Sequence, residues 1–374
     1  MSFSALISQQ SIAQRLATMW DKQRMPHALL LLGPEGCGKL ALALALAKFL
    51  LCENKPDGDA CGHCAGCHKM GKLVHPDLHF VFPVVGSKAT SDQYLVQWRA
   101  ALAEHPFLNV NDWLQSIGAE NKQGNITKDE CHTVIKKLSL KTFEGNAKVM
   151  LIWLPEYLGK EGNRLLKIIE EPPADTYFIL VAEDAELILN TILSRCQLIK
   201  LNALQDEEIM EGLRQAYPNT EKERLQSVTY LAGGNFNEAR KLMDSDTGDH
   251  AQLFLEWLRK AYKGNGVEIV SWVETFAKVG RENQKQFFLY GLHFLRELLQ
   301  LKVLPAEPAR LGAKEMKTAQ NLVKVLQLEQ IDQMIGLFTN AAFHIERNAN
   351  PKILMLDGSI QLSKIMKPRT LQNS

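Results

Sequence analysis

The most informative stretch of the chain lies near the N-terminus and reads His27-Ala-Leu-Leu-Leu-Leu-Gly33-Pro-Glu-Gly-Cys-Gly-Lys39-Leu40. Residues 27–32 form a short apolar run typical of a buried strand, and the glycine-rich residues 33–38 end it. The Ala- and Leu-rich residues 39–51 predict a helix directly after the glycines. A glycine-rich loop between a buried strand and a helix is typical of phosphate-binding loops, because its backbone N–H groups and the helix N-terminus face one anion.

Further short apolar runs follow along the first two hundred residues, with helical patterns between them. This alternation predicts an α/β fold, in which helices cover a parallel sheet. After Leu201 the strand-like runs cease and apolar residues recur at helical spacing, which predicts an all-α remainder. The expected strands are 27–32, 78–82, 149–154, 176–182 and 197–201.

Length and composition narrow the class of protein. The 374 residues suggest two or three domains, and 46% hydrophobic with 23% charged residues is typical of a globular protein. The 43 Lys and Arg residues against 42 Asp and Glu leave a net charge of +1, so no overall charge attracts nucleic acid. Residues 1–6 do not resemble a signal peptide, and no apolar run approaches the roughly 18 residues of a membrane span. We expect a cytoplasmic protein with no membrane association.

The residue after Lys39 is Leu40, which departs from the usual phosphate-loop pattern. Nucleotide hydrolysis at such a loop uses a Ser or Thr at this position to hold Mg²⁺, and an aliphatic side chain cannot ligate a hard cation. Acidic ligands are expected at the end of strand 149–154, but the chain has Trp153 and Leu154 there. Because both motifs lack their magnesium ligands, we expect the fold to be kept and ATP hydrolysis to be lost.

The loop itself remains a candidate nucleotide site. One hypothesis is a structural turn that binds nothing, and the other is weak, magnesium-independent binding of phosphate or nucleotide. In the second case, glycine backbone and the lysine ammonium group would hold the anion. The residues concerned are Gly33, Gly36, Gly38 and Lys39.

Four of the seven cysteines fall within residues 52–67, and they are Cys52, Cys61, Cys64 and Cys67. Four thiolates on short loops can close around one Zn²⁺ at about 2.3 Å per sulfur, with no position open to a substrate. We therefore predict a structural zinc site, with a redox-active CxxC pair as the competing hypothesis. Lys55 is the only Lys or Arg in this segment, which argues against direct reading of DNA. The nearby His63, His68 and His75 are surplus to the site and expected at the surface.

Several separated segments occur together in one known family. They are Arg24-Met-Pro-His27-Ala28, the loop 33–39, the four-cysteine insertion, Asn163-Arg-Leu-Leu-Lys167-Ile-Ile-Glu170-Glu171-Pro172-Pro173 and Thr191-Ile-Leu-Ser194-Arg195-Cys196. In this order they resemble the AAA+ subunits of the bacterial DNA polymerase III clamp loader over residues 1 to about 245. The resemblance is looser beyond, where Asn348-Ala-Asn350-Pro351-Lys352 and helical stripes fit the family's C-terminal part.

The resemblance implies three domains. Residues 1–203 would form an AAA+ phosphate-loop domain that carries the zinc module at 52–67. Residues 204–246 would form a small helical lid, and residues 247–374 a helical collar that joins five subunits in a ring.

The family contains ATP-hydrolysing subunits and a delta-prime type that has lost the catalytic ligands. Leu40, Trp153 and Leu154 make this chain similar to the delta-prime type. The resemblance then implies a subunit that is not itself an enzyme. Its partners would be the ATPase subunits and the delta subunit, in a complex that loads the sliding clamp onto primed DNA.

The resemblance also implies a catalytic role in trans for Arg195. In the family, the arginine of the Ser-Arg-Cys motif reaches the ATP held by the neighbouring subunit. Arg195 would stabilise charge on the transferring γ-phosphate there, with Ser194 and Cys196 as packing and turn residues that aim it.

Two other classes of function remain as alternatives. One is an active motor ATPase whose acids come from unexpected positions such as Glu156 or Glu183, and the other is a stand-alone zinc protein that binds single-stranded nucleic acid. Residues 85–126, with Trp98 and Trp113, are longer than expected for the family and have no predicted role.

Overall fold

The computed structural model describes residues 1–120, 122–244, 250–306, 309–346 and 349–367. The chain forms two compact units, and each is described by itself. The first unit comprises Met1–Pro218 and Gly233–Arg240, and the second comprises Asn219–Ala232 and the chain from Lys241 onward.

A five-stranded parallel sheet lies at the centre of the first unit, in the order β2-β3-β4-β1-β5. Each predicted strand is present to within one residue at either end, and the predicted α/β class with a parallel sheet is confirmed. The strands are β1 (Ala28–Leu32), β2 (Leu78–Val81), β3 (Lys148–Trp153), β4 (Thr176–Ala182) and β5 (Gln197–Lys200).

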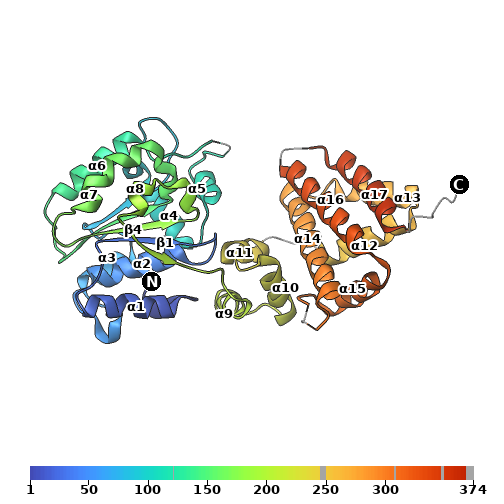
Figure 1. The fold of residues 1–374 in the computed structure, drawn as a ribbon, viewed down its shortest axis with the longest axis horizontal. Coiled ribbons are helices and arrows are strands. Elements are labelled where there is room, and N and C mark those ends of the chain that lie inside the picture. The colour runs from blue at the N-terminus through green and yellow to red at the C-terminus, as the bar shows by residue number, and fades with distance from the viewer. Residues whose placement is uncertain (121, 245–249, 307–308, 347–348, 368–374) are drawn as a thin grey trace. The chain divides into compact units, whose positions relative to one another are not determined.

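Helices cover both faces of the sheet (Figure 1). Helix α2 (Lys39–Leu51) packs against β3 and β4 and is almost wholly buried. On the opposite face, Met150 and Phe178 share a core with Val134 of α6 (Lys128–Ser139). Burial on both faces explains why the strand sequences are continuously apolar rather than alternating.

The remaining helical segments of the first unit are short. Residues 155–165 form a 3-10 segment that continues into α7, and α7 ends before Pro172 because proline disfavours helical geometry in the residue that precedes it. The segments are η1 (Phe3–Ala5), α1 (Gln10–Asp21), η2 (Pro56–Gly58), α3 (Ala65–Gly71), η3 (Ser91–Tyr94), α4 (Leu95–Glu104), α5 (Val110–Ser116), η4 (Pro155–Leu165), α7 (Leu166–Glu170), η5 (Ala185–Leu187), α8 (Asn190–Leu193) and α9 (Asp206–Ala216).

The described part of the second unit is helical throughout, as predicted for the C-terminal half. An aromatic core forms where Phe254, Trp257 and Phe287 meet Phe338, and the indole N–H of Trp257 donates to the Ser359 hydroxyl at 2.8 Å. The helices are α10 (Lys222–Ala232), α12 (His250–Lys263), α13 (Gly266–Phe276), α14 (Arg281–Val303), α15 (Ala313–Val325), α16 (Leu328–Glu346) and α17 (Pro351–Met366).

The predicted middle part, residues 204–246, is divided between the two units. Helix α9 belongs to the first and α10 to the second, while α11 (Phe236–Asp244) begins in the first and ends in the second. The division of the chain into three domains, at residues 1–203, 204–246 and 247–374, stays a prediction. Among the described residues, no helix is both long and apolar enough to cross a membrane.

Candidate functional site

The phosphate loop connects β1 to α2 and is shaped by glycine. Gly36 and Gly38 have φ values of 69° and 89°, in the left-handed region that favours glycine. The N–H of Gly33 donates to the carbonyl of Ala182 at 3.3 Å, which ties the loop to the end of β4. The loop therefore has the backbone turn that the sequence pattern predicts.

The ammonium group of Lys39 is directed at oxygen atoms of its own chain. Its Nζ donates to the carbonyl of Pro34 at 2.5 Å and lies 3.5 Å from a carboxylate oxygen of Glu183. The side chain is only 6% exposed. The charge that a phosphate would need is thus already paired within the loop and the segment after β4.

The three positions at which the magnesium site is expected are apolar and buried. Leu40 lies in the first turn of α2, and Trp153 ends β3. Leu154 follows in a left-handed conformation at φ 56°, and its N–H donates to Val181 on β4. None of these three side chains carries an oxygen, so they offer Mg²⁺ no ligand.

Glu156 and Glu183 are the acids considered for an active ATPase. Both carboxylates already have partners within the chain, since Glu156 accepts backbone N–H groups and Glu183 faces Lys39. One oxygen of Glu156 accepts the N–H groups of Glu183 and Asp184 at 2.5 and 3.0 Å, so this carboxylate organises the loop after β4. Burial raises the pKa of both Glu156 and Glu183 above the ordinary 4.5, and Lys39 counteracts part of this shift.

The four cysteines Cys52, Cys61, Cys64 and Cys67 come together between the end of α2 and the start of α3, with all four sulfurs within 4.8 Å of one another. The separations are 3.5 Å for Cys52 to Cys61, 3.8 Å for Cys52 to Cys64, 3.5 Å for Cys52 to Cys67 and 4.0 Å for Cys61 to Cys67. A tetrahedron of sulfurs at about 2.3 Å from one zinc ion has edges of about 3.8 Å. The donor set thus fits a tetrahedral metal.

Backbone N–H groups support the thiolate form of this cluster. Cys61, Cys64 and Cys67 each donate their N–H to the preceding cysteine sulfur of the set, at 3.3 to 3.4 Å. The backbone N–H of His63 lowers the pKa of the Cys61 thiol to about 6, whereas burial raises the pKa of Cys52 and Cys67. Such N–H···S bonds orient the sulfurs that would hold the metal.

The three histidines near the cluster differ in their positions. His63 and His68 are exposed, but the prediction that His75 lies at the surface is wrong. His75 is buried because its Nδ1 accepts the N–H of Asp77 at 3.2 Å and its Nε2 lies 3.7 Å from Glu144. It therefore joins the cysteine module to the loop after α6.

Arg195 follows α8, and its guanidinium group forms hydrogen bonds within its own chain. Its Nε and Nη2 lie 2.8 and 2.7 Å from one oxygen of Glu170, and its Nη1 donates to the carbonyl of Thr191 at 2.9 Å. Ser194 bonds the same carbonyl, and Cys196 packs against the core beneath the sheet. These partners lie outside the phosphate loop, so the structure does not bring Arg195 together with Lys39.

Residues 85–126, which have no predicted role, form α4 and α5 and an aromatic cluster. Trp98 lies 5.0 Å from both Trp113 and Trp153 and 4.3 Å from Phe82, measured between ring centroids. Asn109 begins α5 with a capping box that includes Asp112. This Asn-x-x-Asp pattern before a tryptophan is the local signal in the sequence from which α5 could have been predicted.

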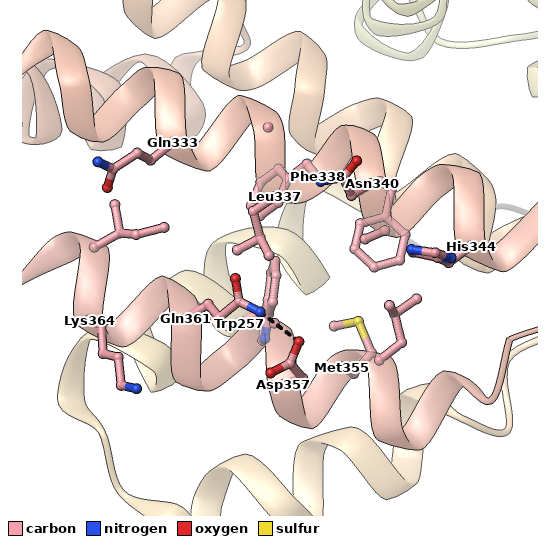
Figure 2. Close-up of a pocket in the computed structure, with 16 residues that line it drawn as sticks. Trp257, Gln333, Leu337, Phe338, Asn340, His344, Met355, Asp357, Gln361 and Lys364 are labelled. Carbon is pink, nitrogen blue, oxygen red and sulfur yellow. Dashed lines mark hydrogen bonds between the residues drawn. The ribbon is translucent and has the colours of Figure 1, made fainter.

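A groove of about 640 Å³ lies in the second unit between α16 and α17 (Figure 2). Phe338 and Trp257 line it with apolar surface, and at its rim the amide of Gln361 donates to Asp357 at 2.6 Å. Its lining offers side-chain amides and single charges, without the paired acids or clustered thiols of a reaction centre.

The fold and the loop together define a class: an AAA+ phosphate-loop protein whose magnesium-binding positions carry no oxygen ligands. Residues 8–205, more than half of the chain, match the family described as DNA polymerase III, delta subunit. The chain belongs to this family, among the delta-prime subunits of the clamp loader.

The curated relatives are delta' and gamma subunits of DNA polymerase III, at modest sequence identity. DNA polymerase III subunit delta' of Escherichia coli is 26% identical over 289 residues, covering 76% of this chain and 72% of its own length. The delta' subunit of Bacillus subtilis is 29% identical over 194 residues, covering 52% and 47%. The gamma subunit of Buchnera aphidicola is also 26% identical, over 247 residues and covering 65% and 58%. The chain thus spans from about half to less than three quarters of these relatives.

The chain also matches solved structures, at lower sequence identity. A gamma subunit-related protein of Thermotoga maritima has 14% identity and a TM-score of 0.36, with 95% of this chain and 99% of that chain covered. The RuvB Holliday junction branch migration motor of the same organism has 13% identity and a TM-score of 0.38, with 84% and 82% covered.

Proposed function

We propose that this protein is the non-hydrolysing subunit of a clamp loader that places the sliding clamp on primed DNA, and that it supplies Arg195 to the ATP site of a neighbouring subunit. The proposal rests on two features found together in one chain. The phosphate loop lacks magnesium ligands, and a partly exposed arginine lies outside that loop. Leu40, Trp153 and Leu154 deny the chain its own magnesium site. Arg195 keeps a charged, partly exposed guanidinium group.

The chemistry expected of Arg195 is electrostatic. A guanidinium group placed against a transferring γ-phosphate offsets the charge that develops in the transition state, which is worth about 10³- to 10⁵-fold in rate in other phosphoryl-transfer systems. Glu170 and the Thr191 carbonyl hold the group in one orientation beforehand. An exposed pair of this kind contributes only about 0–1 kcal/mol, so phosphate can replace Glu170 at little cost.

The remaining parts of the proposal concern metal, partners and location. Cys52, Cys61, Cys64 and Cys67 would hold one structural Zn²⁺, which would stabilise the module without taking part in a reaction. The partners would be ATPase subunits and a delta subunit in a five-membered ring in the cytoplasm. The lid at 204–246 and the collar at 247–374 belong to the same proposal.

Substitution of Arg195 tests the proposed function. In a loader reconstituted with its partner subunits, we expect Arg195→Ala to leave assembly intact and to lower DNA-stimulated ATP hydrolysis by at least about tenfold, because one γ-phosphate loses its countercharge. Phosphate release reports the rate, and size-exclusion chromatography reports assembly. Arg214→Ala, which removes an exposed arginine from α9, is the matched control. An unchanged rate in an intact Arg195→Ala complex would remove the role of this residue.

A further inference from the structure

The segment between β2 and α6 is anchored at both ends. Val84 and Asn125 exchange two backbone hydrogen bonds of 2.9 Å, which close the base of the segment 85–124. Inside it, Trp98 and Trp113 are fully buried, and the indole N–H of Trp113 donates to the carbonyl of Pro83 at 2.7 Å. Trp98 packs on Trp153, the aromatic residue that stands where a magnesium ligand is expected. The segment therefore packs tightly against the end of β3, through the contact between Trp98 and Trp153.

The middle of this segment rests on the phosphate loop. A ring atom of Phe107 lies 3.4 Å from the position that a Cβ at Gly38 would take, so the ring stands next to the loop and leaves little room for a side chain there. The side-chain amide of Asn109 donates to a carboxylate oxygen of Glu35 within the loop at 2.9 Å. A charge-assisted hydrogen bond thus joins the segment to the loop, and the Phe107 ring lies beside it.

Asn235 and Phe236, which follow Gly234, also contact the phosphate loop. The Asn235 amide donates to the same Glu35 oxygen at 3.2 Å, and its side chain fills the space that a Cβ at Gly36 would need. The N–H of Phe236 donates to the Gly36 carbonyl at 3.1 Å. The backbone at Gly36 is therefore packed against Asn235 and Phe236.

Direct contacts also join the two covering segments. The rings of Phe107 and Phe236 lie 4.8 Å apart between centroids, and the Asn237 amide donates to Asp112 at 2.6 Å. Arg240 reaches the carbonyl of Glu104 at 3.4 Å. Asn237 is 1% exposed, so its hydrogen bond is shielded from water. The loop, residues 104–113 and residues 235–240 form one network with Glu35 at its centre.

We propose that residues 104–113 are a built-in strap that closes the phosphate loop against residues 235–240, in the space that nucleotide phosphates would otherwise fill. Two parts of the loop are engaged within the chain. The Lys39 ammonium group is paired with Pro34 and Glu183, and the backbone at Gly36 is approached by Asn235 and bonded through its carbonyl by Phe236. A nucleotide could contact the loop only after the hydrogen bonds and ring contacts of this network had been broken. The strap gives the unexplained segment 85–126 a role, and it favours the hypothesis of a loop that binds nothing over that of a weak nucleotide site.

The substitution Asn109→Asp tests the strap in the full-length chain. Aspartate keeps the N-cap of α5 but places a carboxylate against Glu35. We expect amide hydrogen exchange to become roughly tenfold faster in both 33–42 and 235–240, as expected for loss of a charge-assisted hydrogen bond. The double variant E35Q/N109D, in which the glutamine amide can donate to the carboxylate introduced on the strap, should restore slow exchange. The matched control is Asn125→Asp, the same chemical change at the base of the segment.

A fluorescent ATP analogue, titrated with and without Mg²⁺, supplies the second measurement. We expect no saturable binding by the wild-type chain. Saturable binding that Lys39→Ala abolishes would overturn the strap, and so would unchanged exchange in 33–42 for a folded Asn109→Asp variant. If Asn109→Asp loosens the whole unit, Phe107→Leu makes the same test by removing the ring that stands next to Gly38 and packs on Phe236. Faster exchange confined to the two segments in that variant supports the strap, and unchanged exchange overturns it.

Discussion

Lys39 occupies the position of a phosphate-binding lysine, but its partners are oxygen atoms of its own chain. Its ammonium group bonds the carbonyl of Pro34 and faces Glu183, and the side chain is buried. A buried lysine must be paired, because an unpaired charge inside a protein is costly. The lysine therefore stabilises the turn between β1 and α2 even though the magnesium ligands next to it are absent.

The proposed loss of ATP hydrolysis can be tested at Leu40. We expect no magnesium-dependent phosphate release from the purified chain, and none from Leu40→Thr, because the new hydroxyl would be the only magnesium ligand beside Trp153 and Leu154. Phosphate release with and without Mg²⁺ is the measurement, and Lys39→Ala identifies any contaminating ATPase. Turnover by the wild-type chain that disappears in Lys39→Ala would contradict the prediction.

Asp77 gives a prediction about pH. Its carboxylate accepts the N–H groups of Phe143, Glu144 and Gly145 at 2.6, 3.1 and 2.8 Å. Burial acts to raise the pKa of Asp77, but the three donors outweigh it and hold the pKa below the ordinary 3.8. A depressed pKa stabilises the fold above 3.8, and the stabilisation is lost as pH falls through the lower folded value.

We therefore expect Asp77→Asn to lower the free energy of unfolding by about 1.5–3 kcal/mol at pH 7, the range for hydrogen bonds to a charged group. The difference from wild type should narrow only below pH 3.8. Urea unfolding at several pH values measures it, and Asp92→Asn, at a more exposed aspartate, is the control. A difference that is absent at pH 7 would show that the three N–H bonds do not stabilise the loop.

At the scale of elements, the cysteine module is the part whose stability should depend on metal. Its four sulfurs already have the spacing of a tetrahedral site, and a metal that binds only the folded form adds its binding free energy to folding. We expect one zinc per chain, none in Cys64→Ser, and a Tm several degrees lower in that variant, since about 1 kcal/mol shifts Tm by roughly 2–4 °C in a unit of this size. Metal analysis and thermal unfolding are the measurements.

Cys196→Ser is the control for the cysteine module, because Cys196 lies outside the cluster. It should keep the zinc. Equal metal content in the wild type and Cys64→Ser would contradict a four-thiolate site, and a chain that forms a disulfide in place of binding zinc would support the redox hypothesis.

The elements also differ in how well the sequence predicts them. The five strands are local features, since each is a short apolar run buried on both faces, and their predicted bounds agree with the structure. The covering of the phosphate loop is not local. Trp98 depends on Trp153, and Asn109 on Glu35, 74 positions away in the chain. The prediction for His75 is wrong for a similar reason, because its partner Glu144 lies far away along the chain.

At the scale of the molecule, the second unit has a core of its own and apolar side chains left outside it. Phe254, Trp257 and Phe338 fill the core, whereas Val267 on α13 and Ile353 on α17 are 81% and 67% exposed. Helices α13 and α17 pack against each other, so both exposed residues lie on one packed pair. These two exposed apolar side chains are therefore suitable positions for testing whether a neighbouring subunit covers this helix pair, as the proposed collar role requires.

The last prediction concerns assembly. If the collar joins this chain to its neighbours, mixing it with the ATPase and delta subunits should give a five-membered complex by size-exclusion chromatography with light scattering. The double variant V267K/I353K should fold normally, because both positions are exposed, yet enter the complex with at least about tenfold lower affinity, since burying two ammonium groups costs several kcal/mol. Val96→Lys, at a 76% exposed valine on α4, is the control. Full assembly of V267K/I353K would place the subunit contacts elsewhere on the chain, and failure of the wild type to assemble would contradict the proposed clamp-loader role itself.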